Sequence, residues 1–545
     1  MDLVIRGGMI VDGTGSRPRF YGDIAIDQGK ISRVGSVEDR GDRTIDAKGL
    51  VVTPGFVDIH THSDFPLLQN RNAESSVRQG VTTSIIGSCG RSCAPINDRT
   101  KEFLVKDIIG YDSRLPVTWH SFGEYLSEFE KPGVAQNVAA LVAHDAVRIA
   151  VMGYDTRKPS LEEMEQMKEL VRDCMESGGI GLSTGLAYPP GANADTQEII
   201  ELAKVVSEYG GIYSSHLRGT DGDFVMGARE AVEIGKAANI PVHMGHFCGF
   251  FGDTEETRRG LGVIEKARLE GLDVTCDLYP YLAGANPLMA FLPPSIFNRD
   301  WADLVRAIRK PDERKKLAEE IRQSNIGKFW LTRQETLKRI RLFDIAGSKN
   351  LGFKGKTIAE ISAIKGIDPV ETVLEVLADE DKAMFNLGVI CEWMGELDNY
   401  EVYRKPYHMV GSDGIALAPY GDLASFKFHP RAYGTHPRVI AKYVRKDSVL
   451  TLEEAVYKMT SMPAKRAGIT DRGEIKEGMW ADLVVFDYER ILDKSTYEKP
   501  DLYSEGIEYV IVNGQVVVER GQHTGRLPGK VLRHRSGAKL RGSTA

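Results

Sequence analysis

The stretch Pro54-Gly55-Phe56-Val57-Asp58-Ile59-His60-Thr61-His62 carries two histidines at the end of an apolar run. Side chains alternate across a β-strand, so an extended chain places His60 and His62 on the same face. Two neutral imidazoles held a few ångströms apart can bind a metal ion such as Zn²⁺, and a strand end holds them rigidly. Because a His-x-His pair is common in ordinary strands, it predicts only half of a metal site, whose other ligands must come from elsewhere in the chain.

Length and composition indicate the class of protein. The chain has 545 residues, enough for one large catalytic domain and a smaller attached one. A formal net charge of −7 is small for this length and gives no argument for nucleic acid or a membrane as partner. No apolar run approaches transmembrane length, the first residues do not resemble a signal peptide, and six cysteines do not make a disulfide framework. We expect a cytoplasmic protein with reduced thiols and a small-molecule substrate; a homo-oligomer is left open.

Both ends of the chain predict a small β domain. Short alternating patterns separated by Gly or Asp turns occupy residues 3–53. The same alternating pattern occurs again over residues 481–519, around the turn Asn513-Gly514. We therefore expect residues 1–54 and 473–545 to build one small β-sandwich domain together.

Between these ends, short β-branched runs alternate with longer helical patterns, as is typical of βα units and a parallel sheet. Eight runs are candidate strands: Phe56–His62, Thr82–Cys89, Val138–Ala143, Ile180–Thr184, Ile212–His216, Val242–His246, Val274–Leu278 and Met409–Asp413. Eight such strands predict an α/β fold with a (β/α)₈ TIM-like barrel over residues 55–472. The stretch from Asn298 to Arg341 is charged and helical, so a helical insertion of about residues 285–345 is expected over the barrel mouth.

Residues suited to metal binding and proton transfer gather at the ends of these predicted strands. They are His60, His62, Cys89, His216, His246 and Asp413. Each alone has an ordinary explanation: a hydrogen-bonded core histidine, a small buried thiol, or an aspartate that caps a turn. Functional residues of such a barrel lie at the carboxyl ends of its strands, however, and unrelated core residues would not sort there. The set therefore predicts a metal site, in which a thiolate can bind and even bridge zinc ions.

The order of the motifs resembles the N-acyl-D-amino-acid deacylases (D-aminoacylases) of the metal-dependent amidohydrolase superfamily. The resemblance covers nearly the whole chain. Its motifs are Pro54–His62, the Cys89 turn, Gly181–Leu186, His216-Leu217-Arg218, Asp277-Leu278-Tyr279-Pro280-Tyr281, Ser412-Asp413-Gly414, His429-Pro430-Arg431, Asp471-Arg472-Gly473 and Gly478–Leu483. It implies that Cys89, His216 and His246 hold one zinc ion tightly, and that His60, His62, Cys89 and Asp413 form a second, weaker site.

The identity of the bridging ligand separates branches of this superfamily. The hydantoinase and dihydroorotase relatives usually place a carboxylated lysine between the metals. No lysine of this chain occupies an obvious equivalent place, which favours the deacylase branch with Cys89.

The resemblance implies hydrolysis of an amide C–N bond, with N-acyl-D-amino acids as the substrates. Zinc would polarise the carbonyl and lower the pKa of a bound water toward ~7, so that a hydroxide attacks. Asp413 would act as general base and acid, accepting the proton of the water and passing it to the departing amine.

The substrate is less well defined than the reaction. In the family, the matches of Arg431, Tyr188 and Tyr281 hold a substrate carboxylate, for which an arginine fork is well suited. Family members commonly carry a lysine where this chain has Cys248, and a neutral thiol makes a less polar pocket wall. The alternative is therefore a related amidohydrolase acting on another amide, a lactam, a carbamate or a urea. A hypothesis from another class, a non-catalytic hydantoinase-like assembly protein, is disfavoured because all six candidate ligand positions are filled.

Overall fold

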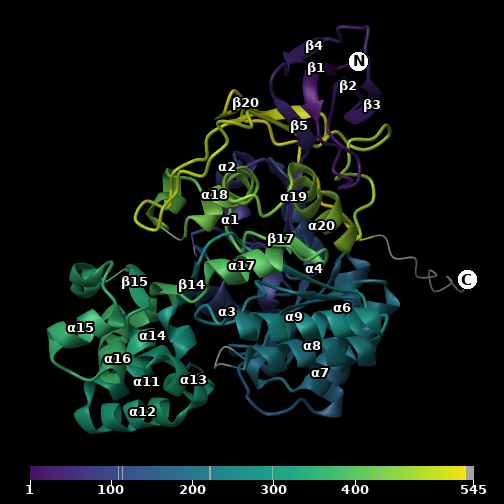
Figure 1. Cartoon of the computed structure of the whole chain (residues 1–545). Coiled ribbons are helices and arrows are strands. Elements are labelled where there is room, and N and C mark those ends of the chain that lie inside the picture. Colours follow the sequence, from purple (N-terminus) through teal and green to yellow (C-terminus); the bar gives the residue numbers. More distant parts are fainter. Residues whose placement is uncertain are drawn as a thin grey trace, which may run out of the picture.

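The structure of the chain is a computed structural model. It describes residues 1–108, 110–112, 114–219, 223–297, 299–345, 347–427 and 429–534. Figure 1 shows strands β1–β5 at the top, helices α6–α9 together on the right, and helices α11–α16 as a separate lobe at the lower left. Strands lie in each of these three regions and pair into separate sheets.

The first sheet joins the two ends of the chain. Its strand order is β21-β20-β19-β18-β5-β1-β2-β3, and β4 pairs with β1. The strands are β1 (Leu3–Ile10), β2 (Phe20–Asp27), β3 (Lys30–Gly35), β4 (Arg43–Asp46), β5 (Val51–Pro54), β18 (Leu483–Phe486), β19 (Ile507–Val512), β20 (Gln515–Glu519) and β21 (Gln522–His523). Strands from both chain ends belong to one hydrogen-bonded sheet, because β18 pairs directly with β5 and so continues the N-terminal strands. The β-sandwich form of this domain stays a prediction. Residues 535–545 of the predicted small domain lie outside the described ranges.

Two further sheets are parallel and contain a strand from each of the eight predicted segments. One has the order β17-β13-β12-β11-β10-β9, and the other β6-β7-β8. Their bounds are β6 (Phe56–Asp58), β7 (Val81–Ile86), β8 (Asn137–Ala140), β9 (Val142–Ala143), β10 (Gly181–Gly185), β11 (Ile212–His216), β12 (Val242–Met244), β13 (Val274–Leu278) and β17 (His408–Val410). Only Leu141 separates β8 from β9, and Thr61 forms an isolated parallel bridge with Gly414.

The strand that was expected to carry His60 and His62 is shorter than predicted. It ends at Asp58, so both histidines follow β6 rather than lie on it. The physical reason is a change of partner. Beyond Asp58 the His62 N–H donates to the Gly414 carbonyl (2.8 Å), and the Asp413 N–H donates to the His60 carbonyl (2.8 Å). The segment therefore pairs with the chain that follows β17.

Helices connect successive parallel strands, so the carboxyl ends of these strands face the same side. They are α5 (His144–Met152), α6 (Leu161–Glu176), α7 (Thr196–Glu208), α8 (Phe224–Ala238), α9 (Thr254–Leu269) and α17 (Glu396–Tyr403). Ser160, Asp195, Asp223 and Asp253 cap α6 to α9 by accepting backbone N–H groups of the first turn. Other helices of the described chain are α1 (Pro66–Gln69), α2 (Glu74–Val77), α3 (Thr100–Asp107), α4 (Phe122–Glu128), α18 (Arg431–Arg438), α19 (Leu452–Met459) and α20 (Ser461–Arg466).

Residues 283–392 form a lobe with its own core, here called the helical lobe. Its sheet has the order β14-β16-β15 with β14 (Ala283–Pro287), β15 (Ile340–Asp344) and β16 (Gly388–Glu392). Its helices are α10 (Pro294–Phe297), α11 (Trp301–Arg309), α12 (Pro311–Gln323), α13 (Asn325–Trp330), α14 (Gln334–Leu337), α15 (Ile358–Lys365) and α16 (Pro369–Glu380).

The helical lobe extends further along the chain than the predicted insertion of about residues 285–345. Its buried cluster runs from Leu288 to Cys391. The lobe is longer because β16 returns between β14 and β15, and the intervening α15 and α16 pack into the same core. Asn298, where the charged helical stretch was predicted to begin, lies outside the described residues.

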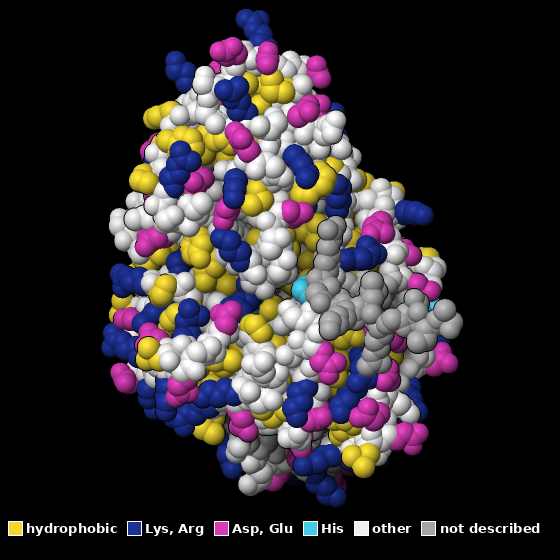
Figure 2. Space-filling model, turned by 90° about the vertical axis from the view of Figure 1, so that its right-hand side faces the viewer, with side chains coloured by type: hydrophobic (Ala, Val, Ile, Leu, Met, Phe, Trp, Pro, Cys, Tyr) yellow, Lys and Arg dark blue, Asp and Glu magenta, His cyan; other side chains and the backbone are white. Residues whose placement is uncertain are grey.

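The surface carries mixed charge. Figure 2 shows acidic and basic side chains interspersed over the face it presents. Large exposed apolar side chains such as Leu161 on α6 and Leu269 on α9 occur singly, which is ordinary for a protein surface. Among the described helices, none combines the length and the apolar character needed to cross a membrane. The cytoplasmic location stays a prediction.

Candidate active site

Cys89 lies on a tight turn directly after β7. Gly87, Cys89 and Gly90 all have positive φ, of 76°, 55° and 74°. A Cβ on Gly87 would come within 2.3 Å of the Leu141 carbonyl oxygen, and one on Gly90 within 2.8 Å of the Gly185 nitrogen. Only glycine fits beside such close backbone contacts, so the two glycines let the turn pack against its neighbours. The turn holds Cys89 buried, with 3% of its surface exposed.

The structure brings the five predicted histidine and cysteine ligands together in two groups that share Cys89. One group is His60, His62 and Cys89, and the other is Cys89, His216 and His246. Within each group the donor atoms lie within 4.8 Å of one another. Cys89 Sγ is 3.1 Å from His60 Nε2 and 3.8 Å from His246 Nε2. Zinc bonds of about 2.0–2.3 Å in a tetrahedral shell place ligand atoms roughly 3–4 Å apart, so this donor set fits zinc.

The surroundings of Cys89 and His216 favour the protonation states that bind metal. Burial alone would raise the pKa of the Cys89 thiol, but the charge of His60 and hydrogen bonds from His216, His246 and His60 hold it well below its ordinary value. Burial and the neighbouring His246 lower the pKa of His216 to about 4, so this imidazole is neutral at pH 7. A thiolate and a neutral imidazole are the forms in which these side chains ligate metal. For His60 and His62, burial would lower the pKa, but Asp277, Cys89 and Asp413 raise it.

Asp277 on β13 orients the histidines, although no role was predicted for it. One carboxylate oxygen accepts hydrogen bonds from His60 Nδ1 (2.9 Å) and His243 Nε2 (2.8 Å), and the other accepts one from the His246 backbone N–H (2.9 Å). Burial would raise the pKa of Asp277, but His60 and His243 hold it well below its usual range. A carboxylate on Nδ1 leaves the Nε2 lone pair of His60 for a metal. The sequence feature that could have indicated Asp277 is its position near the end of the predicted strand Val274–Leu278.

Asp413 joins the histidines to Arg431. Its Oδ1 is 3.0 Å from His62 Nε2 and 3.6 Å from His60 Nε2, and its Oδ2 is 2.8 Å from Arg431 Nη1. Burial would raise the pKa of Asp413, but the charge of Arg431 and the hydrogen bond from His62 hold it well below its ordinary value. Asp413 is therefore an ionised carboxylate beside the donor atoms, as a proton acceptor must be.

Three of these site residues share an unusual backbone conformation. The φ angles of Cys89, His246 and Asp413 are 55°, 35° and 49°. Residues other than glycine rarely adopt positive φ, at a cost of about 1–3 kcal/mol each. Such residues cluster at functional sites, where the surroundings hold them in place. Their occurrence on three separate loops supports a functional reason for the conformation.

Two cavities open from the donor atoms and share the side chains of Tyr188, His216 and His246. The first is further lined by Cys248, Phe250, Phe291, Trp330, Cys391 and Trp393, and is here called the aromatic cavity. The second is further lined by His62, Cys89, Arg91, Asp413 and Arg431, and is here called the arginine cavity. Their volumes, with the open mouths included, are about 760 Å³ and about 920 Å³. Cavities of this order accept small-molecule ligands.

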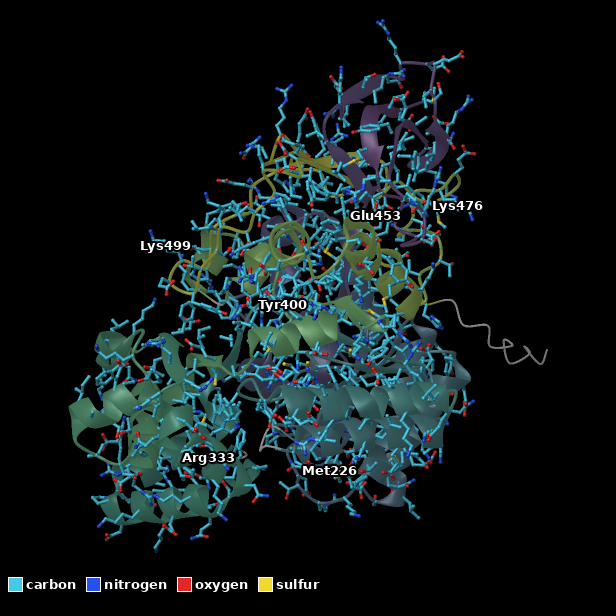
Figure 3. The ribbon with its side chains drawn as sticks, viewed as in Figure 1. Met226, Arg333, Tyr400, Glu453, Lys476 and Lys499 are labelled. Atoms are coloured by element: carbon cyan, nitrogen blue, oxygen red, sulfur yellow. The ribbon has the colours of Figure 1, made fainter. Side chains whose placement is uncertain are left out.

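The cavities lie where the helical lobe meets the parallel strands. Figure 3 labels Met226 on α8 and Arg333 in the helical lobe, which mark the two sides. The aromatic cavity takes Phe224 from α8 and Trp330 from α13 of the lobe. The lobe therefore contributes directly to the site.

Three of the four residues predicted to bind substrate line these cavities. Tyr188 lines both, Cys248 lines the aromatic cavity and Arg431 lines the arginine cavity. The Tyr188 hydroxyl also donates to the Cys89 carbonyl (2.9 Å), which ties this side chain to the ligand turn.

Tyr281 is placed elsewhere. It is buried with its ring against His429 (5.4 Å between centroids), and its hydroxyl is 3.4 Å from Asp493 Oδ2. It is not among the described residues that line either cavity. Tyr279 lies closer to Arg431, whose guanidinium carbon is 4.8 Å from the Tyr279 ring centroid. A substrate role for Tyr281 stays a prediction.

Comparison with known proteins identifies the class. The chain matches the amidohydrolase family over residues 43–240 and 350–518. Together with the buried cysteine and histidine donors, this match defines a metal-dependent hydrolase, and the chain belongs to the amidohydrolase family.

Within that family the chain is similar to D-amino-acid deacylases along nearly its whole length. It is 33% identical over 536 residues to D-aminoacylase of Alcaligenes xylosoxydans xylosoxydans, covering 97% of each chain. It is 32% identical over 536 residues to N-acyl-D-glutamate deacylase of the same organism, covering 98% of this chain and 96% of the relative. The crystal structure of N-acyl-D-glutamate deacylase from Bordetella bronchiseptica, complexed with zinc and a phosphonate inhibitor, matches with a TM-score of 0.79 at 30% identity, covering 98% of this chain and 99% of that one.

Proposed function

We propose that the protein hydrolyses the amide bond of N-acyl-D-amino acids. The observation that carries this proposal is the position of Asp413, an ionised carboxylate between the cysteine and histidine donors on one side and Arg431 on the other. The arrangement offers a metal site, a proton acceptor and a cation for a carboxylate within one cavity. The similarity to deacylases of D-amino acids supports the same substrate class.

For the scaffold, we propose that the two parallel sheets are parts of one closed barrel of eight strands. Its order would be β6, β7, β8 with β9, β10, β11, β12, β13 and β17. Two features support closure: β8 runs into β9 across Leu141 alone, and Thr61 bridges to Gly414 between the ends of β6 and β17. A closed barrel would direct every strand-end residue of the site to one mouth.

For the metal, Cys89, His216 and His246 would hold the principal ion. His60, His62, Cys89 and Asp413 would form a second, weaker site. When bound, zinc supplies a Lewis acid for the scissile carbonyl and lowers the pKa of water. Support for the division comes from Asp413, whose Oδ1 lies 3.0 Å from His62 Nε2, so that a carboxylate already engages one nitrogen of the second group.

Proton transfer, binding of the substrate carboxylate and orientation of His60 would be carried out by residues of the chain. Asp413 Oδ1 would accept the proton of the attacking water and return it to the departing amine nitrogen. Arg431 has several N–H donors, so it can hold Asp413 Oδ2 through Nη1 and still receive a substrate carboxylate. Asp277 would hold His60 in one orientation throughout.

Replacing Asp413 with asparagine tests this assignment. The amide side chain would keep the size of the carboxylate but could not accept a proton, so turnover of N-acyl-D-amino acids should fall by about 10²- to 10⁴-fold. Zinc content, measured by mass spectrometry of the metal, should stay close to that of the wild type. A matched control is Asp303→Asn on the exposed side of α11, which should leave both quantities unchanged. A rate for Asp413→Asn near that of the wild type would remove Asp413 from the reaction.

A second candidate function is the hydrolysis of an amide, lactam, carbamate or urea without a carboxylate. Cys248 favours it, because this buried thiol lines the aromatic cavity and burial raises its pKa well above the ordinary value, so it is neutral. Turnover of N-acetyl-D-amino acids against uncharged aryl amides separates the two candidates. Activity on aryl amides with none on any D-acylamino acid would reject the first.

A further inference from the structure

We propose that the acyl half of the substrate is large and aromatic, and that it occupies the aromatic cavity while the amine half lies in the arginine cavity. The inference rests on the proposed deacylase function and adds to it the identity of the acyl group. It is carried by the shape, the charge and the position of the two cavities.

The wall of the aromatic cavity is built from aromatic rings in mutual contact. The Phe250 ring centroid lies 5.8 Å from Trp330 and 5.3 Å from Trp393, and the Phe291 centroid lies 5.0 Å from Trp330. The Trp330 contacts are edge-to-face, with interplanar angles of 83° and 80°. Such rings present flat apolar faces and fixed edges, against which a planar ring packs more favourably than a small aliphatic group.

Among the described residues that line the aromatic cavity, Arg218 is the only arginine, lysine, aspartate or glutamate. Cys248 and Cys391 are buried, each 1% exposed, and burial raises the pKa of both thiols. Arg218 also lines the cavity, but its guanidinium bonds Glu230 through Nε (2.9 Å) and the Ala194 carbonyl through Nη2 (2.8 Å). A carboxylate placed here would lose its hydration without gaining a new cation.

The arginine cavity combines charged side chains with apolar ones, because Phe343, Phe385 and Phe426 also line it. Arg91 and Arg431 line it, together with Asp413 and the histidine His62. The amine half of an N-acyl-amino acid carries the carboxylate, so charge assigns that half to this cavity. The acyl half is then left for the aromatic cavity.

The position of the donor atoms fits this division. His216, His246 and Tyr188 line both cavities, so the cavities meet at the principal metal group. A scissile carbonyl held there has two substituents, the acyl chain and the amide nitrogen, which point in different directions because the carbonyl carbon is planar. Each substituent therefore has a cavity of its own.

Part of the wall of the aromatic cavity lies outside the two ranges that match the amidohydrolase family. The matched ranges are residues 43–240 and 350–518, and Cys248, Phe250, Phe291 and Trp330 lie between them. Phe291 and Trp330 belong to the helical lobe. The preference for an aromatic acyl group should therefore depend on how the lobe packs.

A substrate series tests the proposal directly. With D-alanine as a fixed amine half, the acyl group is changed from acetyl to hexanoyl to phenylacetyl. The value of kcat/KM should rise by about 10- to 100-fold from acetyl to phenylacetyl, as expected for burying one phenyl group. A companion series keeps the acetyl group and enlarges the amine side chain from D-alanine to D-phenylalanine. If the rise follows the amine side chain and not the acyl group, the assignment of the two cavities is overturned.

Neighbouring phenylalanines provide matched variants. Phe250 and Phe251 both contact Phe329 and Trp330, with centroid separations between 5.4 and 5.8 Å, but only Phe250 is among the described residues that line the aromatic cavity. Phe250→Ala should lower the ratio of kcat/KM for the phenylacetyl substrate to that for the acetyl substrate by at least tenfold. Phe251→Ala should keep this ratio. Equal effects of the two variants would show that the lobe packing, and not the cavity wall, is responsible.

A binding measurement separates failure of this inference from failure of the proposed function. Trp330 and Trp393 are two of the five tryptophans, so ligand in the aromatic cavity should change the intrinsic fluorescence. In zinc-loaded Asp413→Asn protein, phenylacetamide should give a saturable change that Phe250→Ala weakens and Phe251→Ala retains, whereas acetamide should give none. Saturable binding without turnover of any N-acyl-D-amino acid would reject the function and keep the cavity. Turnover of N-acetyl-D-alanine equal to that of the phenylacetyl compound, without phenylacetamide binding, would reject the cavity and keep the function.

Discussion

The buried histidine His436 should contribute a measurable part of the acid sensitivity of the fold. This residue lies on α18, is buried, and stacks its ring on Phe56 of β6 (5.5 Å between centroids, 11° between planes). Neither ring nitrogen has a hydrogen-bond partner within the described residues. Burial lowers the pKa of His436 to about 3. The imidazole is thus held neutral inside an apolar contact.

The size of the effect follows from the two pKa values. An unfolded histidine has a pKa of about 6.5, so between pH 6.5 and pH 3 the unfolded chain binds a proton that the folded chain excludes. The contribution to the free energy of unfolding is therefore unchanged above pH 6.5 and is lost progressively as the pH falls through this window. At about pH 4.5, roughly two pH units below the unfolded value, the loss is about 3 kcal/mol.

His436→Phe keeps a flat ring against Phe56 and removes the proton acceptor. Urea unfolding of wild type and variant, at about pH 7 and about pH 4.5 and with matched metal content, measures the difference. The variant should gain about 3 kcal/mol over the wild type between the two pH values. His120→Phe makes the same change at an exposed position and should lose stability in parallel with the wild type. Parallel losses for His436→Phe as well would refute the assignment of a depressed pKa to this residue.

Three further predictions concern the site and its support. Gly245→Ala should lower turnover at least tenfold while the principal zinc is retained. The reason is that a Cβ at this position would lie 2.7 Å from His60 Cε1 and would displace the ring. Wild-type turnover would mean that the His60 ring moves aside freely. Asp277→Asn should weaken metal affinity by about 10- to 100-fold in a chelator competition, because Asp277 holds His60 and His243; an unchanged affinity would contradict this role. Lys458→Met should flatten the pH dependence of unfolding between pH 8 and 10.5. Burial lowers the pKa of Lys458 to about 8, so the wild type gains up to about 3 kcal/mol as the pH rises through this window; equal slopes for wild type and variant would count against it.

The parallel strands were predictable because each is a short apolar run with an ordinary local pattern. Ile212–His216 and Val274–Leu278 have the predicted bounds. The run through His60 and His62 was predicted too long, because alternation indicates an extended chain but not the point at which its hydrogen-bond partner changes. That point depends on Gly414, which is distant in sequence.

The helical lobe was predicted only in part for a related reason. Charge and helical spacing indicate the first helices, whereas β16 resembles any short apolar strand. Its place between β14 and β15 is a tertiary contact that no local pattern encodes. The predicted insertion therefore ended too early, near residue 345.

The site divides in the same way. The proximity of His60, His62, Cys89, His216, His246 and Asp413 was predictable, because their residue types are unusual at strand ends. Asp277 was missed, because an aspartate near a strand end has many ordinary roles. The aromatic cavity could not be predicted at all, since Phe250, Trp330 and Trp393 come together only through the packing of the helical lobe on α8 and its neighbours.

The pairing of β5 with β18 has a consequence for synthesis of the chain. β5 continues almost directly into β6 and the candidate metal ligands His60 and His62, yet the strand that pairs with its other edge is made near the other end of the chain. At ordinary translation rates, that edge stays open for roughly tens of seconds. An open edge is a template for pairing with other chains, so fragments that end before Leu483 should aggregate through β5. The edge of β5 is therefore covered only after the C-terminal strands have been made.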